Sequence, residues 1–427
     1  MRVRGGAAAR LCPGPRFTTF PPLTLTLSPL RGEGKPLVAL FHYFGCGYAV
    51  ICSSVVYLFL FRMKAWRFYG FNDLRLDDVP DPVRSPGHVL VEPLCVQPSV
   101  TEAQLALGIS TLAFDRIKRR LETEAPVQLF GHEFCARVLE TEGVSRFRPG
   151  DRVAARAKLP CGECPLCRSE RSDLCRKGPV IGFDLPGCFS EIASLPEIAL
   201  VKVDDRISDS EAACLQSLSD SVAAVETAQL RMADAVVIFG QGSMGLECLQ
   251  IARLSGAGLV ITVDVRDEAC QISRELGADH ALNARTCDVI PAIRDLTGGN
   301  GADVVFECAG GSPKQGLAGH GTLLQALEAV RSGGKIVGVS WFGGPMQLNI
   351  DFLRERSLRY LFPDISTQTH LEHTVRLVAS GRVRLKPTIT HILSGIESVP
   401  RAFEITANKG KYKAINPAQV MMRSPAK

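Results

Sequence analysis

Hydrophobic and polar positions follow two different periods between residues 236 and 362, and the two periods alternate along the chain. Short runs rich in β-branched and aromatic residues predict buried strands at 236–239, 259–263, 280–282, 304–307, 336–339 and 358–362. Apolar residues at helical spacing predict helices between them, at 244–255, 267–276, 289–296 and 323–330, the last ended by Gly333-Gly334. Strands that alternate with helices predict a doubly wound, parallel α/β sheet.

The pattern on either side of this sheet is different. Residues 63–100 alternate apolar and polar positions between turns rich in proline and glycine, which predicts small antiparallel strands. Residues 102–125 predict a charged helical segment, and 371–378 predict one amphipathic helix followed by further strands. A chain of 427 residues with these contrasts is expected to hold two or more domains.

Residues 1–62 differ in composition from everything that follows. They hold seven basic residues and one acidic residue, so the rest of the chain carries about −1 of the formal total of +5. A globular part without a basic excess gives no reason to expect nucleic acid as a partner. The apolar run 37–61 is long enough for a membrane anchor. Because a globular pattern begins at Met63, we favour instead a wrongly chosen upstream start codon.

A glycine-rich turn connects the first two strands of the predicted sheet. Gly240 permits the tight turn, Gly242 lets the backbone approach a pyrophosphate, and Gly245 lets the following helix pack closely on its strand. The N-terminus of that helix offers free N–H groups and a partial positive charge to the phosphates. The predicted cofactor-binding residues are Gly240, Gly242, Ser243, Met244, Gly245, Asp264 and Arg266.

The choice between the two nicotinamide cofactors depends on Asp264, which ends the second predicted strand. A carboxylate there accepts hydrogen bonds from the ribose hydroxyls and repels a 2′-phosphate. Arg266 is the competing feature, because it can pair with that phosphate. Asp267 beside it is expected to neutralise the arginine in part. The sequence therefore predicts NAD rather than NADP.

Four of the fifteen cysteines form one cluster, Cys161-x2-Cys164-x2-Cys167-x7-Cys175. Four thiolates at this spacing can close a tetrahedral zinc shell and leave no position open for substrate, so the predicted zinc is structural. The other cysteines are scattered through apolar sequence, which is typical of a reducing compartment, and we expect a cytoplasmic protein.

Five motifs occur in a characteristic order: Gly131-His132-Glu133, the four-cysteine cluster, Gly240-x-Gly242-x-x-Gly245, Gly333-Gly334-Lys335 and Ala402-Phe403…Gly410-Lys411. With them, the chain from Met63 to about Met421 resembles the zinc-containing medium-chain alcohol dehydrogenase superfamily, in particular its sorbitol and threonine dehydrogenases. The resemblance implies a GroES-like, β-rich catalytic domain over 63–215, with a zinc lobe at 161–175 and a return at 363–427. This domain would be split around a Rossmann domain over 216–362.

The same resemblance implies a catalytic site that this chain retains only in part. His132 and Glu133 match the family's Gly-His-Glu motif and are candidate ligands of a catalytic zinc. Aligned on the strand before it, Ser99 stands where the family has a ligand cysteine. Thr101 then stands where the family has the hydroxyl that accepts the substrate proton. The implied catalytic residues are His132, Glu133, Thr101 and Ser99.

Neutral side chains replace charged ones at two further positions of this site. Gln104 stands where some relatives have a histidine, and Gln216 stands near a position where relatives have a carboxylate. Neutral groups are poor zinc ligands, and three alternatives follow. Zinc binds through His132, Glu133 and an unusual ligand such as Cys135. Otherwise the site is metal-free and His132 or Glu133 handles the proton, or the site is inactive.

The expected function is that of an NAD(P)-dependent oxidoreductase that transfers hydride between a nicotinamide ring and a secondary alcohol or its ketone. The alternatives are a zinc-free reductase of activated alkenes and a dinucleotide-binding protein without turnover. The expected partner is a small-molecule substrate, and the expected assembly is a homodimer or homotetramer. A membrane is an expected partner only if 37–61 is a true anchor.

Overall fold

The computed structural model of the chain describes residues 37–39, 56–58, 62–141, 143, 145–311, 319–342 and 344–423. The chain divides into two compact units, Met1–Phe61 and Arg62–Lys427. In the first unit β1 (Leu37–Ala39) pairs antiparallel with β2 (Val56–Leu58), and the rest of the predicted leader lies outside the described residues. Within the described ranges, every helix is too short or too polar to cross a bilayer.

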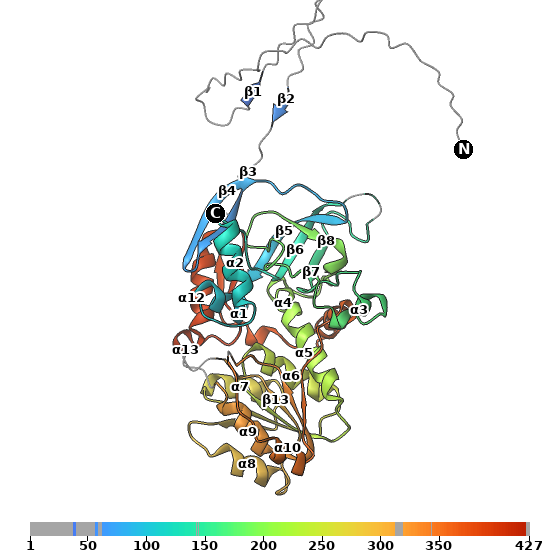
Figure 1. The fold of residues 1–427 in the computed structure, drawn as a ribbon, viewed down its shortest axis with the longest axis vertical. Coiled ribbons are helices and arrows are strands. Elements are labelled where there is room, and N and C mark those ends of the chain that lie inside the picture. Colours follow the sequence, from blue (N-terminus) through green and yellow to red (C-terminus); the bar gives the residue numbers. More distant parts are fainter. Residues whose placement is uncertain are drawn as a thin grey trace, which may run out of the picture. The chain divides into compact units, whose positions relative to one another are not determined.

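Six parallel strands form the sheet that the alternating pattern predicts (Figure 1). Their order is β12-β11-β10-β13-β14-β15, so the sheet is wound in both directions from β10. This confirms the doubly wound Rossmann-type fold, whose ligands bind at the carboxyl ends of the strands beside the point where the order reverses. The strands are β10 (Ala235–Phe239), β11 (Leu259–Asp264), β12 (His280–Asn283), β13 (Ala302–Glu307), β14 (Val330–Gly338) and β15 (Arg359–Leu361).

Side chains along β10 alternate between two hydrophobic cores. Val236 and Ile238 belong to a cluster shared with helices α5, α6 and α11. Val237 and Phe239 belong to another, shared with α8 and α9. Burial on both faces explains why these strands read as continuous apolar runs. The helices of this part are α5 (Leu215–Ala228), α6 (Ser243–Leu254), α7 (Asp267–Glu275), α8 (Val289–Leu296), α9 (Gly321–Ala329), α10 (Ile350–Glu355) and α11 (Gln368–Ala379).

One predicted boundary in this sheet is wrong. Helix α9 ends at Ala329, and β14 already begins at the next residue and runs through the glycine pair. Ala302 pairs with Val330, but Val304 pairs with Lys335, so β14 carries a bulge over 331–334. A Cβ on Gly334 would lie 2.5 Å from the side chain of Val330. The glycines therefore allow an irregular strand, and they do not end a helix.

A second, seven-stranded sheet forms the GroES-like part. Its order is β16-β17-β5-β6-β7-β9, with β8 paired to β5, and β3 and β4 form a separate hairpin. All its pairs are antiparallel except that of β16 with β17. The strands of the sheet are β5 (His88–Gln97), β6 (Glu133–Glu140), β7 (Arg152–Ala155), β8 (Ala193–Pro196), β9 (Leu200–Lys202), β16 (Ile392–Ser394) and β17 (Gln419–Met421). The strands of the hairpin are β3 (Arg62–Gly70) and β4 (Asp73–Pro80).

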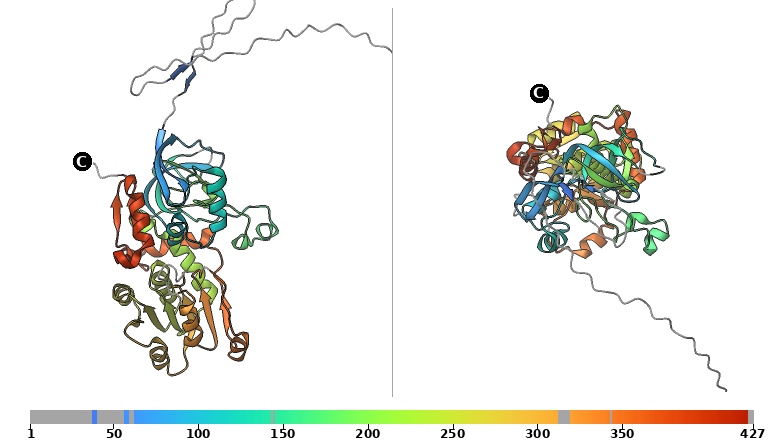
Figure 2. Two further views of the ribbon diagram at one scale, coloured as in Figure 1. Left: turned by 60° about the vertical axis from the view of Figure 1, so that its left-hand side comes forward. Right: turned by 90° about the horizontal axis from the view of Figure 1, so that it is seen from above.

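The end of the chain completes this sheet. Strand β17 pairs antiparallel with β5, with Val420 opposite Val96. Figure 2 shows the red C-terminal elements beside the blue N-terminal strands. The GroES-like domain is therefore split around the parallel sheet, as the resemblance implies. Its short elements are α1 (Val100–Ala106), α2 (Phe114–Glu124), α3 (Pro165–Arg168), η1 (Ser172–Leu174), η2 (Glu197–Ala199), α4 (Asp209–Ala212), η4 (Lys386–Thr388), η5 (Ile396–Ser398), α12 (Val399–Ala407) and α13 (Lys409–Tyr412).

Candidate functional site

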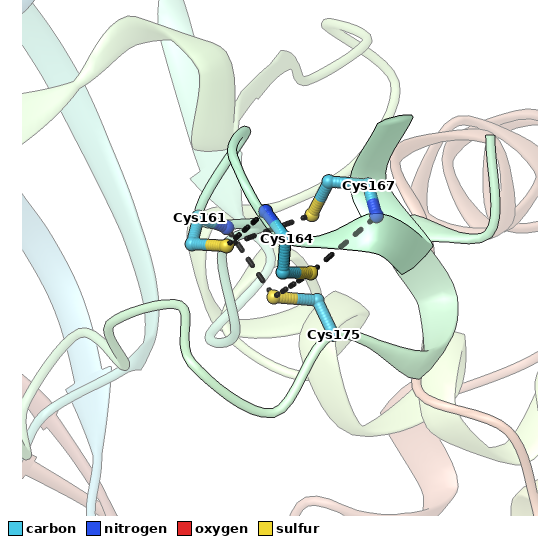
Figure 3. Close-up of side chains that lie close together, drawn as sticks. All are labelled: Cys161, Cys164, Cys167 and Cys175. Carbon is cyan, nitrogen blue, oxygen red and sulfur yellow. Dashed lines mark hydrogen bonds between the residues drawn. The ribbon is translucent and has the colours of Figure 1, made fainter. Parts of the chain in front are cut away.

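The four predicted zinc ligands gather in one lobe between β7 and β8 (Figure 3). Cys161 Sγ lies 3.9 Å from Cys167 Sγ, and Cys164 Sγ lies 3.9 Å from Cys175 Sγ. All four sulfurs lie within 4.8 Å of one another. A tetrahedral zinc ion with bonds of about 2.3 Å would hold its sulfurs about 3.8 Å apart. The sulfur positions therefore fit the predicted structural zinc.

The local backbone directs N–H groups at these sulfurs, which favours the thiolate form that a metal binds. Cys164 is the N-cap of α3, whose first residue is Pro165. The backbone N–H groups of Cys161, Cys164 and Cys167 each donate to a cysteine sulfur, at N···S distances of 3.3–3.5 Å. The hydrogen bond that the backbone N–H of Cys161 donates to Sγ of Cys175 is the main reason why the pKa of Cys175 is lowered to about 6. This favours the thiolate, which is the form that binds zinc.

The glycine-rich turn lies at the carboxyl end of β10. A Cβ on Gly240, whose φ is +86°, would lie 2.7 Å from the loop after β13, and one on Gly245 would lie 1.8 Å from the carbonyl oxygen of Gly240. Gly242 has no other heavy atom within 4 Å of that position, and it is the N-cap of the twelve-residue helix α6. Ser243 and Met244 begin this helix. The turn therefore leaves space for a ligand beside free helical N–H groups.

Asp264 ends β11 and already has protein partners. Its Oδ2 accepts from the backbone N–H of Gln241 at 2.7 Å, and its Oδ1 accepts from the backbone N–H of Arg266 at 2.9 Å and from Nε of that arginine at 3.1 Å. Arg266 also donates to the carbonyl oxygens of Gln241 at 3.3 Å and Ala414 at 3.0 Å. The guanidinium therefore ties the glycine turn to the C-terminal segment.

This pairing differs from the expected one. The sequence suggested that Asp267 would neutralise Arg266, but Asp264 itself forms the ion pair with the arginine. The Oδ1 of Asp267 accepts instead from the side-chain amide of Asn283 at 2.7 Å. Arg266 and Asp264 therefore form an ion pair beside the glycine turn.

His132 is held by a carboxylate that was not among the predicted site residues. Its Nδ1 lies 2.5 Å from Oε1 of Glu102, a side chain with no exposed surface. The same carboxylate accepts from the backbone N–H of Gly131 at 2.9 Å and from that of Ser99 at 3.0 Å. Burial opposes a charge on His132, but the charge and hydrogen bond of Glu102 outweigh burial and raise the pKa of His132 to about 9.

Glu133 begins β6 and meets a buried amide. Nε2 of Gln97, the last residue of β5, donates to Oε2 of Glu133 at 2.5 Å. The other carboxylate oxygen lies 3.9 Å from Nε2 of His132. Burial raises the pKa of Glu133 to about 7, although His132 and Gln97 act in the opposite direction. Gln97 is thus the β5 side chain that contacts the Gly-His-Glu motif.

The structure places the other predicted catalytic residues elsewhere. The hydroxyl of Ser99 accepts from the backbone N–H of Glu102 at 3.1 Å and caps α1. Thr101 is half-buried on α1, and in the described part no hydrogen bond joins it to the Gly-His-Glu motif. Cys135, the suggested unusual ligand, donates to Oδ1 of Asp209 at 3.6 Å. The structure therefore brings His132 and Glu133 together, connects Ser99 to His132 only through Glu102, and in the described part shows no hydrogen bond from Thr101 or Cys135 to either residue.

Helix α5 contributes two further polar groups. Nε2 of Gln216 donates to Oδ2 of Asp220 at 2.9 Å. Burial raises the pKa of Asp220, and the charge of His132 acts to lower that pKa. Asp220 and His132 therefore belong to one charged cluster. Within the described residues, the four-cysteine lobe is the one group of three or more His, Cys, Asp or Glu ligands whose atoms lie within 4.8 Å of one another. His132 and Glu133 belong to no such group in that part of the chain.

Several of these site residues carry weak or no local signals. The spacing Ser99-x-x-Glu102 is that of a capping box, so the sequence did mark Glu102 as a helix-capping acid. Asn416 and Gln419 come from the C-terminal return and donate to Oε1 of Gln97 at 2.9 and 2.8 Å. Nothing in the sequence around these two residues relates them to a strand that ends more than 300 positions earlier.

A parallel sheet with this glycine turn at its reversal point, joined to a β-rich domain, is the architecture of a two-domain, dinucleotide-binding protein. Two family models match the chain, one over the β-rich domain and one over the parallel-sheet domain that follows it. The alcohol dehydrogenase GroES-like domain matches residues 99–205, and the zinc-binding dehydrogenase model matches residues 243–379.

Known proteins resemble the chain over most of its length. L-threonine 3-dehydrogenase from Pyrococcus abyssi is 30% identical over 348 residues, which cover 80% of this chain and 94% of that protein. Erythritol/L-threitol dehydrogenase from Mycolicibacterium smegmatis is 30% identical, with 77% and 90% covered. A crystal structure from Sinorhizobium meliloti 1021 bound to NADP has a TM-score of 0.71 at 26% identity, with 84% and 99% covered. The chain belongs to the zinc-containing medium-chain alcohol dehydrogenase superfamily.

These relatives make the chain an NAD(P)-dependent oxidoreductase of the alcohol and threonine dehydrogenase type. They favour neither the alkene reductase nor the binding protein without turnover.

Proposed function

We propose that the chain transfers hydride between NAD and a secondary alcohol or its ketone at a catalytic centre that works without zinc. The observation that carries the proposal is the arrangement around His132. Gln97 donates to Glu133, the Ser99 hydroxyl caps α1 and Gln216 donates to Asp220, so none of these three neutral side chains supplies a further charged ligand beside His132 and Glu133. A secondary alcohol as substrate is supported by the names of the relatives, since the 3-hydroxyl of L-threonine is secondary.

His132 is the proposed proton carrier. With its Nδ1 held by Glu102, Nε2 is the ring nitrogen available to the substrate oxygen. In ketone reduction the carbonyl carbon receives hydride from the reduced nicotinamide, and the oxygen receives the Nε2 proton. In alcohol oxidation the carbon loses hydride to the oxidised ring, and the hydroxyl proton moves to Nε2. The cofactor supplies the hydride chemistry, and this chain orients the imidazole and exchanges the proton.

The metal content of the protein tests this proposal. We expect one zinc per chain, bound in the four-cysteine lobe, together with NAD-dependent activity on a panel of secondary alcohols and ketones. Elemental analysis after mild chelation gives the stoichiometry, and NADH absorbance gives the activity. Two zinc ions per chain that resist chelation would contradict a zinc-free centre, and turnover of enones without ketones would contradict the substrate class.

The preference for NAD is part of the same proposal. It is supported by the burial of Asp264 at the end of β11, where a 2′-phosphate would add negative charge. Arg266 is engaged by Asp264 and two carbonyl oxygens. We expect NADH to bind about tenfold to a hundredfold more tightly than NADPH, and Asp264→Ala to narrow that gap. Titration of the protein with each reduced cofactor, followed by fluorescence, measures both dissociation constants. Tighter binding of NADPH than of NADH would contradict the proposed preference.

We further propose a cytoplasmic homodimer or homotetramer. The twelve cysteines in the described residues are unpaired thiols, which supports a reducing compartment. Light scattering on the purified chain tests the assembly.

A further inference from the structure

The C-terminal segment 409–416 connects the glycine turn to the catalytic residues through hydrogen bonds. Two cations donate to neighbouring carbonyl oxygens of this segment. Nη1 of Arg266 donates to Ala414 at 3.0 Å, and Nζ of Lys409 donates to Ile415 at 3.0 Å. Arg266 also donates to the carbonyl oxygen of Gln241 inside the glycine turn. Lys409 therefore contacts the residue next to the one that Arg266 joins to the glycine turn.

The next residue connects the same segment to the other end of the site. Asn416 donates to Oε1 of Gln97 at 2.9 Å, and Gln97 donates to Glu133 at 2.5 Å. The residue that Lys409 contacts, Ile415, thus lies between Ala414, which is joined to the glycine turn, and Asn416, which is joined to the Gly-His-Glu motif. The charges of Asp264 and Glu133, one at each end of this path, both act on the lysine.

Lys409 lacks partners for most of its donors. An ammonium group has three N–H donors, and in the described part of the chain Lys409 uses one of them, toward Ile415. Burial lowers the pKa of Lys409 to about 7, and the charge of Arg266 adds to this effect. Arg266 differs, because its guanidinium is engaged by Asp264 and two carbonyl oxygens. Two donors of a poorly solvated cation are therefore left for a ligand, and an anion is the ligand that would stabilise the charged amine most.

The dinucleotide supplies an anion at this position. Its adenosine ribose belongs near Asp264 and its nicotinamide near the Gly-His-Glu motif, so its pyrophosphate must pass between them. We propose that Lys409 is a cofactor-binding residue that donates to this pyrophosphate, opposite the N–H groups of α6. The proposal rests on the use of a dinucleotide, which is part of the proposed function.

The test compares ligands with and without a pyrophosphate. The dissociation constants of NAD, ADP-ribose and adenosine are measured by calorimetry and by displacement of NADH, on the full chain and on the variants Lys409→Met, Lys409→Arg and Lys411→Met. Lys411 is the matched control, because its side chain is 70% exposed and contacts Glu404 and Tyr412. We expect Lys409→Met to bind NAD and ADP-ribose tenfold to a hundredfold more weakly, with adenosine unchanged. Lys409→Arg should stay within about fivefold of the unmodified chain, and Lys411→Met within about twofold.

The outcomes separate this inference from the proposed function. If the unmodified chain binds NAD and Lys409→Met binds it within twofold as tightly, the role of Lys409 is overturned alone. A parallel loss of adenosine binding in Lys409→Met overturns it as well, because that result means the lysine only supports the segment around Ile415. If the unmodified chain binds neither NAD nor NADP, the proposed function itself fails.

Discussion

The four-cysteine lobe and the His132 site both contain side chains that can bind a metal, but these side chains converge in the lobe and do not converge around His132. In the lobe, four thiols from one fifteen-residue segment approach each other at the spacing of a metal shell, and backbone N–H groups point at their sulfurs. Around His132, Glu102 holds Nδ1 of the imidazole and Gln97 donates to Glu133, while Nε2 of His132 has no hydrogen-bond partner in the described residues. A metal shell needs several ligand atoms that converge on one point, and in the described residues only the lobe brings three or more such atoms within 4.8 Å of one another. The contrast teaches that family membership shows which site to examine but not whether that site still fits a metal.

Breaking the lobe should have the largest effect. In Cys164→Ser three thiolates remain with one poor ligand, so the zinc stoichiometry should fall below one. Structural zinc sites contribute metal-binding free energies of about 10–16 kcal/mol, so losing part of that should lower the melting temperature by roughly 5 °C or more. Cys287→Ser, in the parallel-sheet domain, is the control. Unchanged zinc content and melting temperature in Cys164→Ser would show that the lobe holds no structural metal.

Replacing His132, the proposed proton carrier, should lower the turnover rate without changing the metal content. We expect His132→Asn to lower kcat by about 10²–10⁴-fold and to leave both zinc content and the dissociation constant of NAD unchanged. Glu102→Gln should lower kcat less, by roughly tenfold to a hundredfold, because the imidazole keeps a neutral partner. Steady-state kinetics and elemental analysis check both variants. A loss of zinc in His132→Asn would show that the histidine is a metal ligand after all.

Converting the second site into the first sharpens the comparison further. The double change Gln97→Cys with Gln216→Glu puts a thiolate beside Glu133 and a carboxylate on α5, and should raise the zinc content from about one to about two per chain. Ser99→Cys should leave it near one, because Ser99 faces the first turn of α1. Elemental analysis of the two variants decides between Gln97 and Ser99 as the position that corresponds to the family's ligand cysteine. Two zincs in Ser99→Cys alone would favour the alignment expected from sequence.

The smallest effect should appear in the pH dependence of cofactor binding. Because the pKa of Lys409 is lowered to about 7 in the free protein and bound phosphate favours the charged amine, NAD binding takes up a proton above pH 7. The dissociation constant should be flat below pH 7 and rise by up to about tenfold per unit above it. Glu133, Glu247, Asp264 and Arg266 also face this amine, and the first two titrate nearby. Lys409→Arg keeps all four, so a profile in that variant as steep as that of the unmodified chain would assign the effect to them.

Local patterns were sufficient where one segment carries the whole feature. The spacing Cys161 to Cys175 places four sulfurs together because a short segment has few ways to close. The run from β10 to Asp264 predicts its own turn, since only glycine accepts the conformation of Gly240 and the close contact at Gly245. Burial of the parallel sheet on both faces likewise makes its strands visible as apolar runs. The glycines at 333–334 were the exception, because a bulge inside β14 and a helix end look alike in sequence.

The sequence by itself therefore determined the Rossmann-type sheet, the cysteine lobe and the dinucleotide turn, and the resemblance to a known family added the split GroES-like domain. Only the tertiary structure decided which side chains face His132. Glu102 on α1 contacts His132, Gln97 on β5 contacts Glu133, and Asn416 of the C-terminal segment contacts Gln97. Pairing between β5 and β17 brings together segments that lie more than 300 residues apart. Hydrogen bonds between such segments depend on where the backbones pack, and no local period in the sequence records that packing.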